Sequence, residues 1–576
     1  MKFIMASRIA GVVVRPPLVV CLGSMMICLS PTIQSESPSG QLFVDVASES
    51  GLTDLIVCGK NQSKKYILET LGSGVALADY DRDGNLDAFF VNGSQLEGFA
   101  VGQAPTHHLY RNAGNGKFVD VTKAAGLAAS GWGQGVCVGD YDNDGFDDLF
   151  ITYYGHNTLY RNRGNGTFND VTKEAGLYSD TVRWGTGCAF VDYDNDSYLD
   201  LFVANYLVFD PENTPLPGSN NNCMWRGVPV MCGPRGLKAE TNLLYHNNRN
   251  GTFNDKSEVS GILKPGGRYA LSVTPSDFDQ DGASDIYVAV DSQGSLLYHN
   301  KNNGTFDEIG VVAGVAYSED GREQAGMGTA AGDFNGDGFL DLVKTNFAND
   351  TANLYRNNGD GSFEEITKIA GLGQVTKYLG WGAAFLDFDD DSWPDILLVN
   401  GHVYPEVEGK VPDQKFRQAR VLYRNEGGKK FTNYSRFGGT GISQERSSRG
   451  MAVGDYDNDG DLDVFISNMG EAPSLLRNQR ANHQNFLSIF LVGTRSNRDG
   501  IGAKVTVLSK GRKQFSEVRS GSSFLSHHDI RQHFGLGTSS VIDRIEIRWP
   551  SGILQIIRNV KANQFLTIKE SGSKPS

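Results

Sequence analysis

Residues 140–148 read Asp-Tyr-Asp-Asn-Asp-Gly-Phe-Asp-Asp, with carboxylates at positions 1, 3, 5 and 9 and glycine at position 6. Carboxylates this close together repel one another unless a hard cation lies among them. Ca²⁺ suits such a site, because it takes about six to eight oxygen ligands in a flexible shell. Glycine at the sixth position permits a sharp turn with positive φ. The stretch therefore predicts a calcium-binding loop.

The same pattern occurs seven times in the chain, which makes a chance acidic turn a poor explanation. The copies begin at Asp79, Asp140, Asp192, Asp277, Asp333, Asp387 and Asp455. A run of small or apolar residues precedes each copy, and a short apolar run follows it. Position 12 holds an apolar residue or lysine instead of the glutamate that an EF-hand requires, which excludes that motif. Each copy is therefore predicted to join two β-strands.

We expect these loops to hold up to seven structural Ca²⁺ ions through the residues at positions 1, 3, 5, 7 and 9. In chain order, these residues are Asp79, Asp81, Asp83, Asn85, Asp87; Asp140, Asp142, Asp144, Phe146, Asp148; Asp192, Asp194, Asp196, Tyr198, Asp200; Asp277, Asp279, Asp281, Ala283, Asp285; Asp333, Asn335, Asp337, Phe339, Asp341; Asp387, Asp389, Asp391, Trp393, Asp395; and Asp455, Asp457, Asp459, Asp461, Asp463. Three loops depart from the pattern. Ser197 and Ser392 replace glycine at position 6, where a left-handed residue costs roughly 1 kcal/mol, and Asn335 replaces one aspartate. We expect weaker binding or a distorted turn in these three.

A second repeat alternates with the loops. Residues 109–127 contain Leu-Tyr-Arg-Asn, an Asn-Gly turn, Phe, Asp-Val-Thr and Ala-Gly-Leu, and related units follow up to residue 439. Two short apolar runs joined by Asn-Gly or Asp-Gly predict a β-hairpin. Each period therefore contains four short strands, as a propeller blade does.

The two ends of the repeat region predict how the ring closes. Residues 43–52 resemble the last strand of a unit with nothing before it, and residues 475–478 resemble a third strand whose fourth never follows. The N-terminal strand is expected to complete the last blade, which leaves no free sheet edge. The fold class is therefore predicted to be all-β: a seven-bladed β-propeller with calcium loops.

The strand order places the calcium loops on one face of the propeller and two long insertions, about residues 205–242 and 401–420, on the other. Long loops on a rigid scaffold are frequent binding sites. The expected ligand-binding residues on that second face are Trp132, Arg183, Trp184, Arg235, Arg268, Trp381, His402 and Arg449. The alternative is that the tryptophans pack inside the central channel.

Past residue 482 the repeat stops, and strand-like runs separated by Gly and Ser predict a small β-sandwich. The predicted domains are a signal peptide at 1–35, the propeller at 41–480, the β domain at 482–570 and a disordered tail at 571–576. The predicted signal consists of basic residues before an apolar run at 18–29, and an uncleaved signal anchor is the alternative.

Composition limits the partners. The formal net charge is −14, and 27 of the 67 acidic residues lie in the seven loops, which argues against nucleic acid as a partner. Outside the cytoplasm, Cys223 and Cys232, which bracket a loop with Pro and Gly, are expected to form a disulfide. The sequence does not decide the state of Cys58, Cys137 and Cys188. A monomer that is not an integral membrane protein is expected.

The motifs resemble known families. The repeats resemble the FG-GAP/VCBS units of integrin-α-type propellers. Residues 497–503, 533–537 and 548–552 resemble the ASPIC/UnbV domain, and the Cys-x8-Cys-Gly-Pro-Arg-Gly insertion is similar to that of the cartilage acidic protein family. This resemblance implies a secreted, calcium-binding protein located outside the cell, or in the periplasm or on the cell surface of a bacterium.

Two classes of function remain open. We expect a calcium-binding module that recognises an extracellular protein or polysaccharide. The alternative is an accessory enzyme of the lyase or cyclase type, acting in the propeller mouth in a secondary-metabolite or polysaccharide pathway. The sequence contains no Gly-x-Ser-x-Gly, His-Glu-x-x-His or phosphate-loop motif. His527, His528 and His533 cluster in sequence, but a packing role is favoured over a zinc site.

Overall fold

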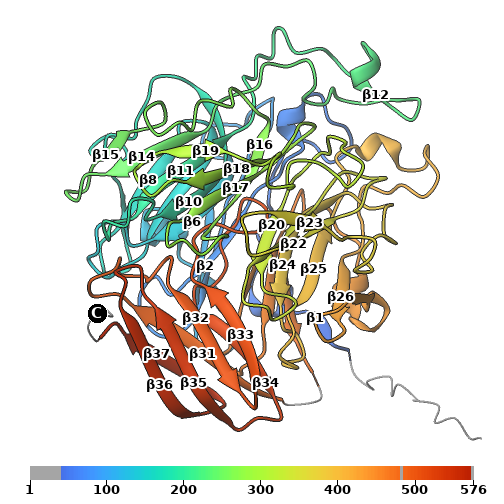
Figure 1. The fold of residues 1–576 in the computed structure, drawn as a ribbon. Coiled ribbons are helices and arrows are strands. Elements are labelled where there is room, and N and C mark those ends of the chain that lie inside the picture. The colour runs from blue at the N-terminus through green and yellow to red at the C-terminus, as the bar shows by residue number, and fades with distance from the viewer. Residues whose placement is uncertain (1–40, 481–483, 572–576) are drawn as a thin grey trace, which may run out of the picture. The chain divides into compact units, whose positions relative to one another are not determined.

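The structure, a computed structural model, describes residues 41–480 and 484–571. The predicted signal peptide and the tail after residue 571 lie outside the described residues. Short strands dominate the chain, and they form seven antiparallel four-stranded units followed by two further sheets (Figure 1). The predicted all-β fold with a propeller and a C-terminal β-sandwich is confirmed.

The first three blades each contain four antiparallel strands. They are blade 1, β2 (Val75–Ala78), β3 (Asp87–Phe90), β4 (His108–Asn112), β5 (Phe118–Asp120); blade 2, β6 (Trp132–Gly139), β7 (Asp148–Gly155), β8 (Thr158–Asn162), β9 (Phe168–Asp170); and blade 3, β10 (Arg183–Val191), β11 (Asp200–Asn205), β14 (Leu243–Asn247), β15 (Phe253–Asp255). Blades 2 and 3 are joined at their inner strands, where β7 pairs with the start of β10.

The remaining blades repeat this order. They are blade 4, β16 (Ala270–Ser276), β17 (Asp285–Val290), β18 (Leu296–Asn300), β19 (Phe306–Glu308); blade 5, β20 (Thr329–Gly332), β21 (Asp341–Lys344), β22 (Asn353–Asn357), β23 (Phe363–Glu365); blade 6, β24 (Gly380–Leu386), β25 (Asp395–Asn400), β26 (Val421–Asn425), β27 (Phe431–Asn433); and blade 7, β28 (Ser448–Gly454), β29 (Asp463–Asn468), β30 (Ser474–Asn478), β1 (Phe43–Asp45). The first strand of each blade contacts the first strand of the next, and β28 contacts β2, so the ring is closed.

The closing strand is the one that the sequence predicts. β1 pairs antiparallel with β30, with Phe43 opposite Asn478 and Asp45 opposite Leu476. Residues more than 400 positions apart therefore share one sheet. This pairing covers the outer edge of blade 7, which would otherwise present unpaired backbone groups.

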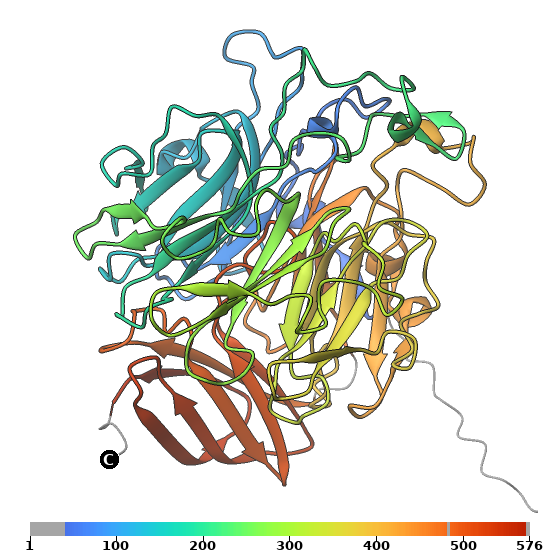
Figure 2. The ribbon, with the colours of Figure 1, turned by 45° about the horizontal axis from the view of Figure 1, so that its top comes forward.

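The helices are short. They are α1 (Ala47–Ser50), α2 (Thr122–Ala125) and α3 (Thr440–Ser443), with 3₁₀ turns at Ile67–Glu69, Asn221–Cys223, Pro405–Val407 and Ser435–Phe437. No helix within residues 41–480 and 484–571 is long and apolar enough to cross a membrane. The insertion in blade 3 carries the small hairpin β12 (Met224–Trp225) and β13 (Val228–Pro229), at the opposite end of the propeller from the last sheets (Figures 1 and 2).

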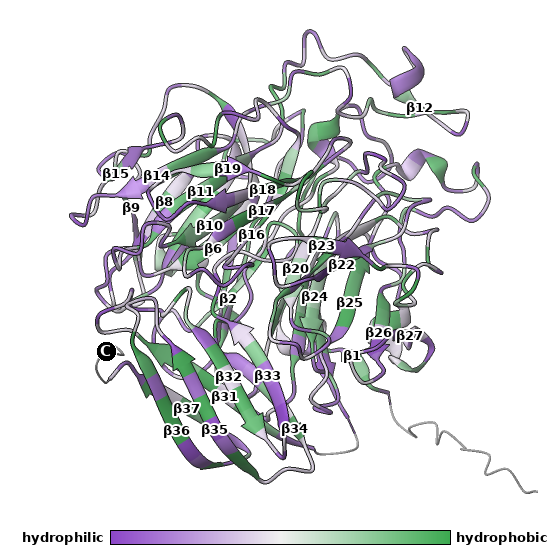
Figure 3. Cartoon of the chain, viewed as in Figure 1, coloured by the Kyte–Doolittle hydropathy of each residue, from purple (hydrophilic) through white to green (hydrophobic). Residues whose placement is uncertain are grey.

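The C-terminal domain is a sandwich of two sheets. Its strands are β31 (Asn485–Val492), β32 (Lys504–Ser509), β33 (Arg512–Glu517), β34 (Gln532–Gly537), β35 (Val541–Arg548), β36 (Leu554–Lys561) and β37 (Gln564–Lys569). One sheet has the order β34-β31-β37, and the other has the order β33-β32-β35-β36. Alternating side chains of β31 and β32, including Leu487, Ile489, Val505 and Val507, are buried in one apolar cluster. The strands of this domain carry both hydrophobic and hydrophilic bands along their length (Figure 3).

A segment of this domain, residues 519–531 between β33 and β34, fills the central channel of the propeller. Ser523 and Thr329 exchange two backbone hydrogen bonds of 2.8 and 3.0 Å, which ties the segment to blade 5. On the other side of the channel, the Val136 N–H in blade 2 donates to the Leu525 carbonyl at 3.1 Å. The propeller and the sandwich therefore share backbone hydrogen bonds within one compact unit.

The inner strands leave room for this segment because they carry glycine. A Cβ on Gly74 of blade 1 would lie 1.7 Å from the Leu525 carbonyl oxygen. At the centre, the Phe524 ring meets the edge of Trp381, with the ring centroids 4.6 Å apart. The small-residue runs before the acidic loops therefore have a packing cause.

Candidate functional site

The acidic loops share one hydrogen-bonding pattern. In the first loop, Asp79 accepts from the backbone N–H of Asp83 at 3.0 Å and from that of Gly84 at 2.9 Å. In all seven loops, the backbone N–H at position 7 donates to the carboxylate at position 5. In the first two loops, carboxylate oxygens from positions 1, 3 and 9 lie within 4.8 Å of one another.

The backbone of every loop is left-handed at two positions. The predicted one is position 6, with φ of 90° at Gly84. Ser197 and Ser392 adopt φ of 74° and 78° there, so the serine loops keep the same turn and bear its strain. Position 4 is also left-handed in all seven loops, with Asn143 at 58°, and the sequence analysis missed this.

Several loop oxygens are buried without a hydrogen-bond partner among the described residues. They are Oδ1 of Asp81, Asp389 and Asp457 at position 3, Oδ2 of Asp87 and Asp463 at position 9, and Oδ1 of Asp277 at position 1. A buried carboxylate oxygen with no partner is costly, so such atoms need a partner, which a water or a cation can supply. An oxygen-only set at these positions suits a hard cation such as Ca²⁺.

The titration behaviour of the loops agrees with this requirement. Burial, reinforced by the neighbouring aspartates, raises the pKa of Asp87, Asp140 and Asp192 to about 8. The charged carboxylates are thus disfavoured in the protein alone. A bound divalent cation would reverse that preference, because it favours the ionised ligands.

Basic side chains of the third strands hold oxygens of further loop carboxylates. Arg161 Nε lies 2.7 Å from Asp142 Oδ2 in the second loop, on the strand that carries Leu-Tyr-Arg-Asn. In blades 3 and 4, histidine takes this arginine position, and His299 Nδ1 lies 3.1 Å from Asp285 Oδ1. Its hydrogen bond to Asp285 raises the pKa of His299 to about 9. A basic side chain on the third strand of a blade therefore helps to hold the carboxylates of that blade's acidic loop in place.

The predicted ligand-binding side chains on the opposite face are mostly buried. Trp184, Trp381, His402 and Arg449 are at most 1% exposed. The Arg449 guanidinium lies 4.2 Å from the centre of the Trp381 ring and donates to several backbone carbonyls, including that of Thr70 at 3.0 Å. These four side chains pack inside the ring and do not form an exposed surface. The alternative that the tryptophans are packing residues holds for Trp184 and Trp381.

The other arginines of that face are also engaged. Arg183 pairs with Glu240 at 2.8 Å, and Arg235 pairs with Glu323 at 3.2 Å. Arg268 donates to its neighbouring carbonyl at 3.0 Å, and Trp132 lies half-buried at the edge of the same packing. The positive charge of the expected basic patch is therefore largely balanced by glutamates that lie next to its arginines.

A cavity of about 420 Å³ lies beneath the blade 3 insertion at this end of the propeller. The predicted disulfide between Cys223 and Cys232 is present and fixes the insertion. Trp225, on β12, and Tyr404, from the blade 6 insertion, line the cavity, and their ring centroids lie 6.2 Å apart. We call this space the mouth cavity.

The carboxylate of Asp291 lines the mouth cavity and has no ion-pair partner among the described residues. Asp291 accepts hydrogen bonds from Tyr206 Oη at 2.6 Å and from Ser292 Oγ at 2.8 Å. Burial raises the pKa of Asp291. The cavity thus combines aromatic walls with hydrogen-bonding groups, as sites for sugars and for protein side chains do.

Family models match most of the chain. FG-GAP-like repeats match residues 79–151, 140–203, 236–288, 277–344, 333–398 and 417–466. The model described as ASPIC and UnbV matches residues 493–575. The chain belongs to the FG-GAP-like repeat family. Its C-terminal sandwich is an ASPIC and UnbV domain.

Curated relatives carry the name cartilage acidic protein 1. The human protein is 29% identical over 327 residues, which are 55% of this chain and 46% of the relative. The mouse protein is 26% identical over 397 residues, which are 67% of this chain and 54% of the relative. The chain thus spans about half the length of the curated relatives it matches.

Solved structures match more distantly. A protein of Agrocybe aegerita, solved for its specific recognition of non-reducing terminal N-acetylglucosamine, gives a TM-score of 0.35 at 16% identity, over 63% of this chain and 79% of that one. YCF48 bound to D1 peptide gives a TM-score of 0.38 at 8% identity, over 74% of this chain and 100% of that one.

The FG-GAP repeats are joined to one another by a ring of asparagine side chains. The asparagine that ends the third strand donates to the carbonyl at position 2 of the preceding blade's acidic loop. The seven pairs are Asn112–Tyr456, Asn162–Tyr80, Asn247–Tyr141, Asn300–Tyr193, Asn357–Phe278, Asn425–Phe334 and Asn478–Phe388. Each donor–acceptor distance lies between 2.7 and 2.9 Å. The acidic loops therefore also form the joints between blades.

Aromatic pairs reinforce the same joints of the FG-GAP repeats. The ring at position 2 of each loop packs on the phenylalanine of the next blade's fourth strand. The pairs are Tyr456–Phe118, Tyr80–Phe168, Tyr141–Phe253, Tyr193–Phe306, Phe278–Phe363, Phe334–Phe431 and Phe388–Phe43. The repeats contain these residues at fixed spacing, but the sequence does not say which blade each ring contacts.

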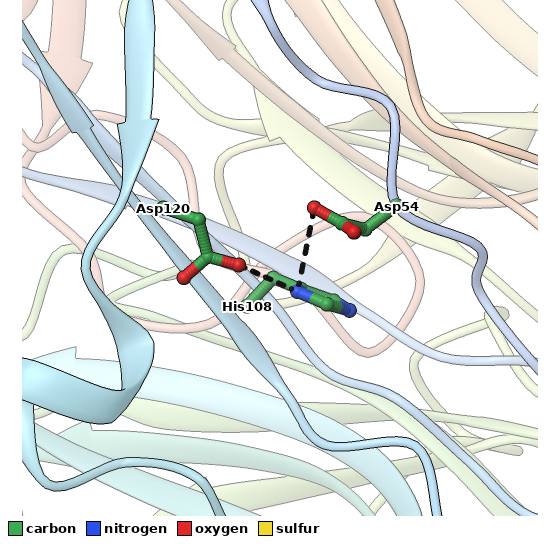
Figure 4. Close-up of side chains that lie close together, drawn as sticks. All are labelled: Asp54, His108 and Asp120. Carbon is green, nitrogen blue, oxygen red and sulfur yellow. Dashed lines mark hydrogen bonds and ion pairs between the residues drawn. The ribbon is translucent and has the colours of Figure 1, made fainter. Parts of the chain in front are cut away.

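A further cluster joins Asp54, which precedes blade 1, to His108 and Asp120 of blade 1 (Figure 4). His108 Nδ1 lies 3.0 Å from Asp120 Oδ2 and 3.8 Å from Asp54 Oδ2. Tyr110 Oη also donates to Asp54 at 2.6 Å, and the Asn92 amide lies 3.4 Å from His108 Nε2. The polar atoms of this cluster are thus already paired, which gives it a structural role.

Proposed function

We propose that this protein is a calcium-stabilised extracellular recognition module that binds its partner at the mouth cavity. The cavity itself carries the proposal. It lies beneath an insertion fixed by a disulfide, it is lined by aromatic side chains, and it contains the half-buried carboxylate of Asp291, which has no ion-pair partner among the described residues. Concave sites of this kind with a few polar groups are the usual places for ligands.

Calcium is proposed to bind in the seven acidic loops through the residues predicted from the sequence. The unpaired oxygens at positions 1, 3 and 9 support this assignment, as do the raised pKa values of the loop carboxylates. Because each loop also accepts the asparagine of the neighbouring blade, a cation there would stiffen the joints of the ring. The role proposed for calcium is therefore structural.

An extracellular location is supported by three observations. The Cys223–Cys232 disulfide suits an oxidising compartment. The sequence predicts an export signal at 1–35, and the relatives are named cartilage acidic protein 1. The ligand is proposed to be an extracellular glycan or protein, since aromatic rings stack on both sugar faces and aliphatic side chains.

The test is an array of immobilised extracellular glycans and proteins, probed with the purified chain in excess Ca²⁺ or in EGTA. Replacing Trp225 with alanine should reduce capture about tenfold or more, because buried aromatic anchors contribute most to binding. The matched control is Tyr178→Ala, an exposed aromatic residue that does not line the cavity. Equal capture by both variants would place the binding site elsewhere.

A further inference from the structure

A second cavity, of about 640 Å³, lies between the propeller and the C-terminal domain. Blades 1 and 2 form one wall, and strands β31 and β37 form the other. It lies at the opposite end of the channel segment from the mouth cavity, so it is separate from the proposed recognition site. We call it the interdomain cavity.

The walls of the interdomain cavity are apolar because of strand alternation. Leu487, Ile489 and Leu491 of β31 point into the sandwich core, so Phe490 and Val492 lie on the opposite face and line the cavity. From the propeller side, Leu77, Leu86 and Val138 are also part of the lining. A polar or heavily hydrated molecule would lose its water here without replacement.

One buried hydrogen-bond donor in this wall has no partner. His527 is 1% exposed and lines the cavity. The Gly521 N–H donates to its Nδ1 at 3.3 Å, so the proton of the neutral ring is on Nε2. Burial lowers the pKa of His527 to about 3, which keeps the ring neutral. Nε2 is buried and has no hydrogen-bond partner among the described residues.

The position of His527 is fixed by the propeller. Its backbone N–H donates to the Val75 carbonyl at 3.0 Å, and its carbonyl accepts from the Leu77 N–H at 3.1 Å. These bonds fix the backbone at His527, and the Gly521 N–H holds the imidazole through Nδ1. An occupant of the cavity that carries an acceptor oxygen would satisfy the free Nε2–H and recover the cost of leaving it unpaired.

The charged groups of the lining disfavour ionic occupants. Arg531 pairs with Asp529 at 2.7 Å, and Asp499 accepts from the Asp140 N–H at 2.7 Å. Of the other charged lining residues, Asp79 and Asp147 are acidic and Arg82 is basic, so acidic groups outnumber basic ones and disfavour an anionic head group. The apolar walls offer no compensation for a desolvated cation.

We propose that the interdomain cavity binds a neutral, largely apolar small molecule whose carbonyl oxygen accepts a hydrogen bond from His527 Nε2. The volume accommodates a molecule of about two fused rings or a medium-length chain, since ligand cavities commonly measure roughly 300–1,000 Å³. The ligand would contact both domains, so it would also strengthen their association. This function is independent of recognition at the mouth cavity.

The probe is prodan, a neutral naphthalene ketone whose emission shifts to shorter wavelength in apolar surroundings. It is titrated into the full chain in excess Ca²⁺, and saturable binding with one site is expected. Val492→Trp fills the cavity and should weaken binding at least tenfold. Val541→Trp is the matched control on an exposed strand position outside the lining, and it should bind as the parent does.

The role of the donor has its own test. His527→Leu should weaken prodan binding about tenfold, the equivalent of one hydrogen bond of about 1.4 kcal/mol, and it should leave binding of N-phenyl-1-naphthylamine, which has no carbonyl, nearly unchanged. If His527→Leu does not fold, prodan is compared on the parent protein with its analogue in which CH2 replaces the ketone C=O, and the analogue should bind about tenfold more weakly. The proposal is wrong if prodan does not saturate or if Val492→Trp binds it normally. It is also wrong if the CH2 analogue binds the parent as tightly as prodan does, or if laurate competes as well as a neutral ketone.

Discussion

Replacing Phe43 with alanine tests whether the N-terminal strand holds the propeller closed. Phe43 is fully buried, and its ring lies 6.3 Å from that of Phe388 in blade 6. It belongs to the same apolar cluster as Ile442 and Leu476. Removing a fully buried phenylalanine side chain costs about 3–5 kcal/mol of folding free energy, because the burial of its apolar surface is lost and a cavity is left in the core. We expect Phe43→Ala to destabilise the protein by this amount.

The expected change in melting temperature is modest because the protein is large. Unfolding entropy is about 2.1 cal/mol/K per residue, so the roughly 530 described residues give about 1.1 kcal/mol/K if they unfold as one unit. A loss of 3–5 kcal/mol then lowers Tm by about 3–5 °C. Differential scanning calorimetry in excess Ca²⁺ resolves a shift of this size.

The matched control is Phe431→Ala. Phe431 occupies the same fourth-strand position in blade 6, is equally buried, and lies 5.5 Å from Phe334. Blade 6 is formed by four strands that follow one another in sequence, so loss of the Phe431 side chain should not open the ring. We expect similar Tm values for both variants, but faster proteolysis within residues 41–52 and more aggregation for Phe43→Ala alone. If Phe43→Ala melts like the parent protein while Phe431→Ala is destabilised, the reasoning on closure is wrong.

Three other predictions concern the acidic loops. Removing calcium with EGTA should lower Tm markedly. Each bound ion adds RT ln(1 + [L]/Kd) to the free energy of unfolding, about 4 kcal/mol when calcium is in thousandfold excess over Kd. An unchanged melting curve would refute the calcium assignment. Asp87 and Asp140 have a folded pKa of about 8, above the unfolded value, so the stability they give the metal-free protein is complete below the unfolded pKa and is lost as pH rises through about 8. Dialysed, metal-free protein should therefore gain more Tm from added Ca²⁺ at pH 8 than at pH 5, and an equal gain would contradict this. Ser392→Gly should raise the free energy of unfolding by about 1 kcal/mol, because glycine relieves the strain of the left-handed turn. Ser197→Gly should gain less, because it loses the hydrogen bond from the Ser197 hydroxyl to the Arg495 carbonyl. Chemical denaturation compares the two variants.

Much of the fold could be predicted because it depends on repeated local patterns. The spacing of the acidic loops and hairpins predicts the blades, and the incomplete units at residues 43–52 and 475–478 predict the exchanged strand, which pairs as expected. The disulfide between Cys223 and Cys232 also follows from local context. In each case the deciding information lies in neighbouring residues.

Other features could not be predicted because they depend on contacts between distant segments. Residues 519–531 contain serine, glycine and histidine and read as a polar loop, yet they fill the channel. Arg449 and Trp381 read as an exposed basic and aromatic surface, but they bury one another. The free oxygens of the acidic loops become evident only when every other hydrogen bond has been assigned. Burial of polar residues is not encoded in a short stretch of sequence.

The channel segment also limits how a partner can reach the propeller. Phe524 packs against Trp381, and Trp381 lines the mouth cavity, so the C-terminal domain contributes to the base of that cavity from the opposite end of the ring. With the channel filled, the proposed ligand of the mouth cavity would enter past the Cys223–Cys232 insertion. Loss of the domain would remove the support beneath Trp381. If the mouth cavity binds a partner as proposed, the ASPIC and UnbV domain would affect that binding without facing the partner, through the packing of Phe524 on Trp381.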